Sequence, residues 1–343
     1  MDNKIIGTIS GILKSTINPE TSKPFILDKD INILVKEGHV DLTININPNK
    51  LNLYDSLKEK LQKKILSIPN VLTTNVILTA EKKGIDSNTG NNKYKINTKN
   101  IIAIASGKGG VGKSTVAVNL AMALNKIGKD VALLDADIYG PSIPKMMGIS
   151  AKPITNENNK LIPLENYGIK CMSIGFLIGA DTPTIWRGPM IMKALEQLFV
   201  SVEWGNPDYM IVDLPPGTGD TQITMAQKVP LKGAIIVSTP QDIALIDARK
   251  GINMFEKVNV PVLGLIENMS FFICDECNKR HEIFSYGGAK NESVRLGTNF
   301  LGEIPINKDL RICSDKGKPI SVDNPSNEIS KIYLEIAKKI ESI

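Results

Sequence analysis

The first part of the chain combines strand patterns with helix patterns. Apolar and polar residues alternate in short runs, and alternation predicts strands with one buried face. Elsewhere apolar residues recur at helical spacing, which predicts amphipathic helices. The strand-like runs are 31–35, 40–46 and 71–78, and the helical segments are 5–17 and 53–68. Residues 1–80 are therefore predicted to form a small α+β domain.

A polar segment separates this part from the rest of the chain. Residues 81–100 are rich in Lys, Asn, Gly, Ser and Thr and offer almost nothing to bury. A segment of this composition cannot offset its conformational entropy by packing. We therefore predict a flexible linker over 81–100.

From residue 101 to residue 343, short continuous apolar runs alternate with helical patterns. The apolar runs are 101–105, 131–134, 209–212, 234–237 and 262–266, and the helical patterns include 190–204, 221–229 and 243–258. Continuous apolar runs are typical of strands buried on both faces. Their alternation with helices predicts an α/β domain, a doubly wound, mostly parallel sheet whose ligands bind at the carboxyl ends of the strands.

A last helical pattern places four isoleucines on one face, at Ile329, Ile332, Ile336 and Ile340. Glu and Lys are balanced on the opposite face, whereas a helix that binds a membrane surface is basic. We therefore predict that this helix docks on the core and is not a membrane anchor.

Composition is that of an ordinary globular protein of the cytosol. Of 343 residues, 42% are hydrophobic and 22% charged, with 41 basic and 36 acidic residues and a net charge of +5. This excess is too small to argue for nucleic acid as a partner. No apolar run is long enough to cross a bilayer and no signal-type block follows Met1, so we expect no membrane partner and a cytoplasmic location.

Residues 107–114 carry a phosphate-binding motif. Gly107, Gly112, Lys113 and Ser114 fit G-x-x-x-x-G-K-[ST] between a predicted strand and a predicted helix. The glycines let successive backbone N–H groups face phosphates at a helix N-terminus. Lys113 is predicted to bind the β- and γ-phosphates, and the Ser114 hydroxyl to bind Mg²⁺. The motif indicates a nucleoside triphosphate site.

Acidic residues close two of the predicted strands. Asp213 is the candidate for holding a water in the Mg²⁺ shell. The glycine-rich segment 214–220 after it is predicted to be a switch loop that responds to the γ-phosphate. Asp135 and Asp137 close the other strand, where a carboxylate can order the attacking water or the metal. We favour Asp137 for the water; the alternative is that either aspartate caps the next turn.

These segments together resemble one group of ATPases. The run 108–114, with its early Lys108, resembles the deviant Walker A motif of the MinD/ParA, nitrogenase-reductase and arsenite-pump ATPases. Within that group, segments 135–142, 213–220 and 267–270, followed by Cys274 and Cys277, resemble the Mrp/ApbC branch of iron–sulfur carrier ATPases. The N-terminal part resembles the small domain that many bacterial Mrp proteins carry, so the resemblance covers nearly the whole chain.

The resemblance implies a homodimer that sandwiches nucleotide, in which Lys108 reaches the partner's ATP and Asn268 reads the adenine. It implies catalytic roles for Lys108, Lys113 and Asp137. The nucleotide-binding set is Gly107, Lys108, Gly109, Gly110, Val111, Gly112, Lys113, Ser114, Thr115, Asp213 and Asn268. Hydrolysis is expected to be slow, because no motif identifies an arginine finger. Arg187 is the candidate for an interface or switch contact.

Cys274 and Cys277 form a C-x-x-C pair that can bind one metal ion or one edge of a cluster. A single pair is weak evidence on its own. A [4Fe–4S] cluster commonly takes four thiolates, so a dimer of the kind implied by Lys108 would supply the other two. An intersubunit Zn²⁺ is the main chemical rival. Cys171 and Cys313 are predicted to be buried.

Three functions remain in competition. The first is an ATP-hydrolysing carrier that receives an iron–sulfur cluster from scaffold proteins and passes it to apo-proteins. The second is a positioning or targeting ATPase of the MinD/ParA type, with Zn²⁺ bound at the cysteines. The third is a reductase that feeds electrons from a cluster to a partner enzyme. The close cysteine pair and the charge-balanced last helix favour the carrier.

Overall fold

The computed structural model describes residues 2–19, 23–25, 31–36, 39–45, 54–69, 71–79, 93–178 and 188–343. The chain divides into two compact units, Met1–Gly90 and Asn91–Ile343, and each has a hydrophobic core of its own. The predicted small domain falls in the first unit. Residues 80–92, which include most of the predicted linker, lie outside the described residues.

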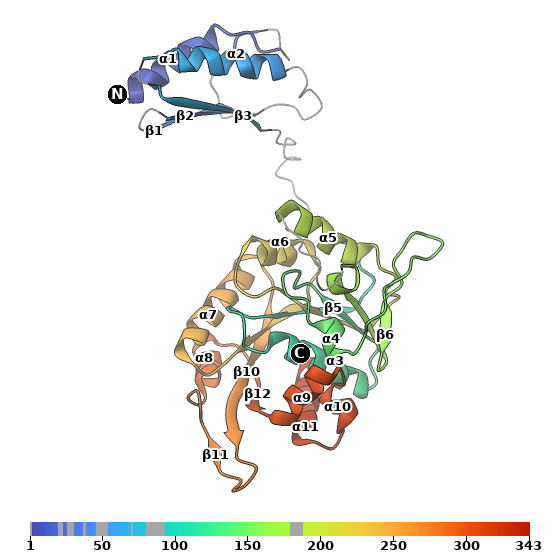
Figure 1. Cartoon of the computed structure of the whole chain (residues 1–343). Coiled ribbons are helices and arrows are strands. Elements are labelled where there is room, and N and C mark those ends of the chain that lie inside the picture. The colour runs from blue at the N-terminus through green and yellow to red at the C-terminus, as the bar shows by residue number, and fades with distance from the viewer. Residues whose placement is uncertain are drawn as a thin grey trace. The chain divides into compact units, whose positions relative to one another are not determined.

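The first unit packs two helices on one face of a small sheet (Figure 1). Its elements are α1 (Asp2–Lys14), β1 (Ile31–Lys36), β2 (His39–Asn45), α2 (Asp55–Leu66) and β3 (Thr73–Thr79). The sheet order is β1-β2-β3, with β1 antiparallel and β3 parallel to β2. Alternate residues of β2, Val40, Leu42 and Ile44, are buried with Ile9 of α1 and Ile65 of α2. This burial explains the alternation in the sequence.

Residues 93–99, the last part of the predicted linker, belong to the second unit. The Tyr94 backbone N–H donates to the Lys228 carbonyl oxygen at 2.7 Å, and the Tyr94 ring centroid lies 6.2 Å from that of Phe199. These contacts anchor the segment that leads into the first strand of the unit.

The second unit is built on a nine-stranded sheet, ordered β11-β10-β9-β4-β8-β5-β7-β6, with β12 paired to β10. The central strands are parallel, whereas β6 and β11 are antiparallel to their neighbours. The strands are β4 (Asn100–Ala105), β5 (Val131–Asp135), β6 (Leu164–Asn166), β7 (Ile169–Ser173), β8 (Tyr209–Asp213), β9 (Gly233–Ser238), β10 (Val262–Ile273), β11 (Arg280–His281) and β12 (Phe300–Ile306). The predicted fold class, a doubly wound and mostly parallel sheet, is confirmed.

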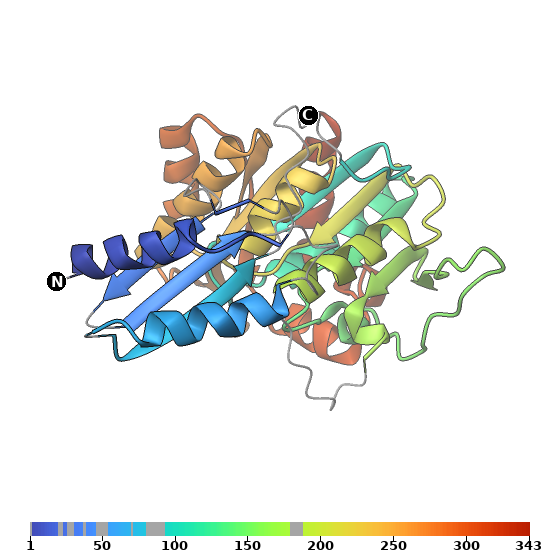
Figure 2. The same ribbon diagram turned by 90° about the horizontal axis from the view of Figure 1, so that it is seen from above.

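Helices cover both faces of this sheet, with α5 and α6 on one side and α3 and α11 on the other (Figures 1 and 2). The helices are α3 (Lys113–Lys126), α4 (Ile143–Met146), α5 (Gly188–Val200), α6 (Asp220–Lys228), α7 (Asp242–Lys257), α8 (Gly288–Leu296), α9 (Lys308–Lys316), α10 (Ile320–Asp323) and α11 (Glu328–Glu341), with a 3₁₀ turn at Ile174–Phe176. Ile329, Ile336 and Ile340 of α11 are buried, and α11 packs on α3 and β12. Its predicted docking on the core is confirmed.

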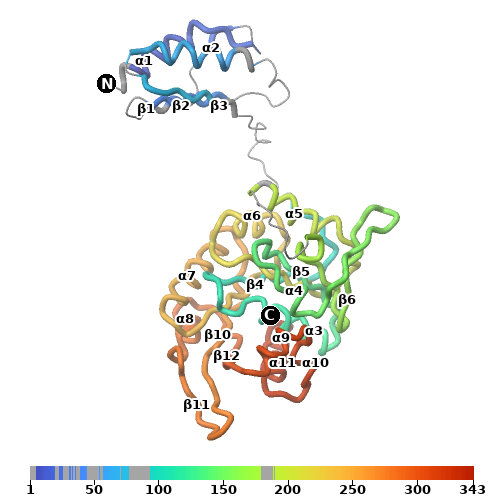
Figure 3. The backbone as a smooth tube through the Cα atoms, viewed as in Figure 1, coloured from blue at the N-terminus to red at the C-terminus, as the bar shows by residue number. Residues whose placement is uncertain are grey.

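Strand β10 is longer than its apolar run indicated. The run at 262–266 predicts a short buried strand, but β10 continues to Ile273 because its second half pairs with β12 and then with β11. The extension turns at Cys274–Asn278 and returns as β11, and this hairpin projects from the unit (Figure 3). The cysteine pair therefore lies on a hairpin that grows directly out of the sheet.

Candidate functional site

The phosphate loop connects β4 to α3 in a conformation that requires glycine. Gly110 and Gly112 have φ of +80° and +81°, the left-handed region that side chains rarely adopt. A Cβ on Gly107 would lie 2.2 Å from the backbone carbon of Asp247 in α7. The loop is thus held against α7, and its end leads into the first turn of α3 at Lys113. The predicted nucleotide-binding residues 107–115 thus form one continuous loop and the start of α3, and their contact with phosphate stays a prediction.

Asn268 of β10 lies directly beneath this loop. Its Nδ2 donates to the Val111 carbonyl oxygen at 2.8 Å, and the side chain is buried. A Cβ on Gly112 would lie 2.2 Å from the same Nδ2. Asn268 therefore supports the phosphate loop in this structure, a role the sequence did not reveal. Its predicted contact with adenine stays a prediction.

Lys113 brings the predicted phosphate-site residues together. Its Nζ lies 2.6 Å from Asp213 Oδ1, 3.6 Å from Asp137 Oδ2 and 3.5 Å from Ser114 Oγ, and its side chain is only 6% exposed. The carboxylates come from the ends of two adjacent strands, β8 and β5, which pair in parallel. The buried ammonium is thereby compensated by charge, as burial of a cation requires.

Asp213 has the unused capacity that a Mg²⁺ site needs. Its carboxylate is fully buried, and Oδ2 has no hydrogen-bond partner among the described residues. Burial raises the pKa of Asp213, and the Lys113 ammonium opposes that shift. A hard divalent cation prefers oxygen ligands, and an unpartnered carboxylate oxygen beside the Ser114 hydroxyl fits that preference. Ser114 and Asp213 could therefore hold Mg²⁺, directly or through a water.

Asp135 and Asp137 have different surroundings. The Asp135 carboxylate accepts the Asp137 N–H at 3.1 Å, the Ile143 N–H at 3.2 Å and the Ser173 hydroxyl at 3.1 Å. Burial, followed by the neighbouring Asp213 carboxylate, raises the pKa of Asp135 to about 7. Asp135 thus caps the turn after β5, which is the alternative role predicted from the sequence for either aspartate. Asp137 is partly exposed and stays our candidate for ordering water.

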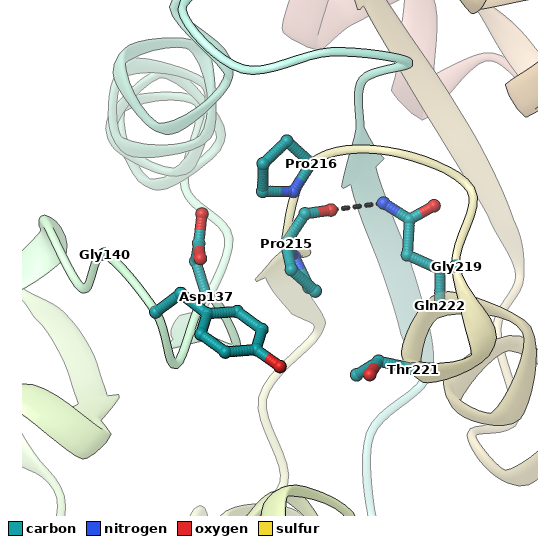
Figure 4. Close-up of a pocket in the computed structure, with 8 residues that line it drawn as sticks. Asp137, Gly140, Pro215, Pro216, Gly219, Thr221 and Gln222 are labelled. Carbon is teal, nitrogen blue, oxygen red and sulfur yellow. Dashed lines mark hydrogen bonds between the residues drawn. The ribbon is translucent and has the colours of Figure 1, made fainter. Parts of the chain in front are cut away.

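A cavity of about 480 Å³ opens beside Asp137 (Figure 4). One wall carries Asp137 and Gly140, and the other carries Pro215 and Pro216 of the switch loop. Gln222 of α6 donates from Nε2 to the Pro215 carbonyl oxygen, as the dashed line shows. The predicted water-ordering carboxylate and the predicted switch loop therefore face the same cavity. Gln222 was not predicted, because no local motif marks it.

The cysteine pair lies at the tip of the β10–β11 hairpin. Cys274 is half-buried and Cys277 is exposed, and both are free thiols. The Cys274 N–H donates to the Lys279 carbonyl oxygen at 3.0 Å, and the Asn278 N–H donates to the Cys274 carbonyl oxygen at 2.9 Å. Hydrogen bonds from the backbone of Cys277 and then Glu276, with a further one from the Cys277 thiol, lower the pKa of Cys274. A thiolate is the form that binds metal.

Arg280 fastens the hairpin to the sheet. Its Cζ lies 3.7 Å from the Phe271 ring centroid and 4.7 Å from that of Tyr286, and its Nη1 lies 3.4 Å from Glu303 Oε1. Cation–π contact and an ion pair act together on one side chain. No local pattern indicated Arg280, because its partners lie on β10, β12 and the loop before α8.

Other predicted residues lie apart from this site or outside the description. Lys108 is half-buried, and no ion pair of its ammonium occurs among the described residues. Arg187 lies outside the described residues. Cys171 and Cys313 are buried as predicted, and burial raises the pKa of both thiols.

Across the described part of the chain, no group of three or more His, Cys, Asp or Glu side chains could hold a metal ion. No described helix has the length and hydrophobicity to cross a membrane.

The fold, the glycine loop and Asp213 at the end of β8 define a P-loop NTPase. A family model described as ParA, NUBPL iron-transfer P-loop NTPase, matches residues 97–341. The chain belongs to this family, which confirms the resemblance drawn from its motifs.

Individual relatives carry names of iron–sulfur proteins. The chain is 57% identical over 244 residues to the iron–sulfur cluster transfer protein NUBPL of Dictyostelium discoideum, covering 71% of this chain and 76% of that protein. It is 42% identical over 350 residues to the iron–sulfur cluster carrier protein of Aquifex aeolicus (strain VF5), covering 95% and 96%. One solved structure is that of a nucleotide-binding protein of Archaeoglobus fulgidus in complex with ADP, in which cobalt was also found. Its sequence is 38% identical to this chain, and the two structures align with a TM-score of 0.60. The alignment covers 69% of this chain and 93% of that one.

Proposed function

We propose that this chain is a cytoplasmic, ATP-dependent iron–sulfur cluster carrier that holds a [4Fe–4S] cluster between two copies of itself and transfers it to apo-proteins. The observation that carries the proposal is the thiol pair on the β10–β11 hairpin, in the same unit as the phosphate loop. The names of the Dictyostelium and Aquifex relatives support cluster transfer, and the ADP complex of the Archaeoglobus protein supports nucleotide binding.

The number of thiolate ligands that the cluster needs indicates a dimer. A [4Fe–4S] cluster commonly takes four thiolates. Cys274 and Cys277 supply two, and Cys171 and Cys313 are buried elsewhere in the unit. The hairpin projects into solvent, so the same pair of a second copy can approach it. Two hairpins then complete a site that one chain leaves half built.

The nucleotide site has the groups that hydrolysis of ATP requires. Lys113 supplies positive charge for the β- and γ-phosphates, and those phosphates would compete for it with Asp213 and Asp137. Asp137, at the cavity beside the switch loop, would order the attacking water. In the dimer, Lys108 of each copy would reach the nucleotide of the other. We expect the turnover to be slow.

Anaerobic reconstitution with iron and sulfide tests the carrier function. We expect about four iron and four sulfide per two chains, broad thiolate-to-iron absorption and a dimer by size-exclusion chromatography. Cys274→Ser or Cys277→Ser should abolish the cluster and leave ATP binding intact, because the phosphate loop, residues 107–115, contains no cysteine. Cys313→Ser is the matched control, since this thiol is buried in α9 and should be dispensable.

The rival function predicts a different metal content. A zinc-clamped positioning ATPase would carry one Zn²⁺ per dimer on the same four thiolates. If the purified protein holds zinc and takes up no iron and sulfide, the carrier function is wrong. If the cluster does load, a pull-down of cluster-loaded protein, with and without ATP, would identify the apo-proteins and scaffold proteins we expect as partners.

A further inference from the structure

One residue in the middle of β10 has a backbone conformation foreign to a strand. Met269 has φ of +56°, the left-handed region that costs a non-glycine residue energy. The pairing of β10 with β12 shifts its register between Asn268 and Phe272, around this residue. Such irregularities in strands bend the strand and re-aim the side chains around them. Here the irregularity divides β10 into an inner half and an outer half.

The inner side of this irregularity touches the phosphate loop. Asn268 donates to the Val111 carbonyl oxygen at 2.8 Å. The Met269 Cε lies 3.8 Å from the position that a Cβ on Gly112 would occupy. Val111 and Gly112 are the last loop residues before α3, where backbone N–H groups face bound phosphates. A shift of this loop on nucleotide binding therefore acts directly on Asn268 and Met269.

The outer side leads to the cysteine hairpin through a series of polar contacts that begins in the core and ends at the surface. Ser270 Oγ donates to Glu267 Oε1 at 2.6 Å and lies 3.4 Å from Glu303 Oε2. The other oxygen of Glu303 accepts from Arg280 Nη1 at 3.4 Å. Glu267 is fully buried, and its second oxygen accepts the Ala289 N–H at 2.6 Å. The outer half of β10 is thus fastened at Ser270 and at Arg280, three residues beyond Cys277.

We propose that the segment 268–270 couples the phosphate loop to the cysteine pair, so that nucleotide binding changes the accessibility of Cys274 and Cys277. Met269 is the residue that can change: rotation into the ordinary strand region would relieve its strained backbone and re-aim the hairpin beyond it. A coupling of this kind needs an element with two arrangements that both sites bias. Its use in loading or releasing a cluster rests on the proposed function; the coupling itself does not.

The test is the rate at which iodoacetamide alkylates Cys274 and Cys277, located by mass spectrometry, with and without Mg·ADP. Cys171 and Cys313 are buried and contribute little background. In the unaltered chain we expect saturating Mg·ADP to change the rate by about fivefold or more, the lower end of common allosteric couplings. Met269→Gly relieves the strain and removes the side chain that lies beside Gly112, so the alkylation rate of this variant should respond to Mg·ADP by less than about twofold.

Asn259→Gly is the matched control. Asn259 has φ of +57° and is exposed in the turn after α7, away from both sites, so the same substitution type should leave the full response. If Met269→Gly fails to fold or to bind ADP, Met269→Asn, which tolerates the left-handed region, takes its place. An unaltered chain that does not respond to Mg·ADP, or a Met269 variant that responds like Asn259→Gly, overturns the coupling.

The two proposals fail in different ways. A chain that loads a cluster but shows no nucleotide response in alkylation keeps the carrier function and loses the coupling. A chain that shows the response but takes up no iron and sulfide keeps the coupling and loses the carrier function.

Discussion

The phosphate loop and the cysteine hairpin differ in how much of their site one chain completes. The loop is enclosed: Lys113 is 6% exposed, Asp213 is fully buried, and Asn268 supports the loop from below. The hairpin is open, with one half-buried and one exposed thiol. Under the proposed function, one copy supplies most of the contacts to the nucleotide, whereas the cluster is bound by two copies together.

This difference assigns separate tasks to the two regions. A preorganised site binds with little further loss of conformational entropy, so its affinity belongs to the single chain. A site shared by two chains gains its affinity from assembly and loses it when the copies part. The hairpin is thus suited to a ligand that must be passed on.

The largest effect is expected for Lys113→Ala. The change removes the buried ammonium that the phosphates require, so ATP affinity should fall on the order of a hundredfold, or about 2.7 kcal/mol. Cluster loading of the hairpin should be unchanged. Isothermal titration with ATP and iron analysis of the same preparation measure both. Asp137→Ala is the companion variant, and it should bind ATP normally but release phosphate slowly. Equal loss of binding in both variants would contradict the role of Asp137.

Lys108→Ala tests whether the nucleotide site also depends on the second copy. Nucleotide binding by the single subunit should remain, and most hydrolysis should be lost. Mixed dimers of Lys108→Ala with Lys113→Ala contain one site with both lysines intact, so phosphate release should recover in the mixture. If no mixing ratio restores activity while tagged hybrids demonstrably form, Lys108 does not act across the interface.

Gly112→Ala and Gly110→Ala separate backbone strain from contact with β10. Both glycines have φ near +80°, but a Cβ on Gly112 would meet Asn268 at 2.2 Å, and a Cβ on Gly110 would meet nothing within 4 Å. We expect Gly110→Ala to lower the free energy of unfolding by about 1 kcal/mol. Gly112→Ala should cost about 1 kcal/mol more, because it breaks the bond to Val111. Urea denaturation measures the difference, and equal losses would mean that Asn268 contributes nothing to loop stability.

The last prediction concerns the pH dependence of stability. The folded-state pKa of Asp135, about 7, lies above its ordinary value of 3.8, so the folded chain binds more protons between these values. Its contribution to the free energy of unfolding therefore falls as pH rises from about 4 to about 7 and is constant above, with a slope of at most about 1.4 kcal/mol per pH unit. Urea midpoints of nucleotide-free protein should show this fall between pH 5 and 7. Asp135→Asn should flatten it, and an unchanged slope would assign the titration to other groups.

Local patterns predicted those parts of the molecule that depend on neighbours in sequence. The buried strands, the glycine loop and the C-x-x-C spacing all lie within a few consecutive residues. The bond from Asn268 to Val111 joins residues 157 positions apart, and no period in the sequence reports it. The outer half of β10 was missed because pairing with β11 and β12, and not a continuous apolar run, makes it a strand. Arg280 depends on partners from three different segments for the same reason.

Tyr94 determines where the chain can be divided for study in pieces. Its hydrogen bond to Lys228 and its ring contact with Phe199 join the residues before β4 to the second unit. A fragment that begins at residue 91 keeps both contacts, whereas one that begins at 101 uncovers the side of Phe199 and leaves the Lys228 carbonyl without this donor. Chimeras that exchange the N-terminal unit between relatives should therefore be joined at residue 90, where the two compact units meet in sequence.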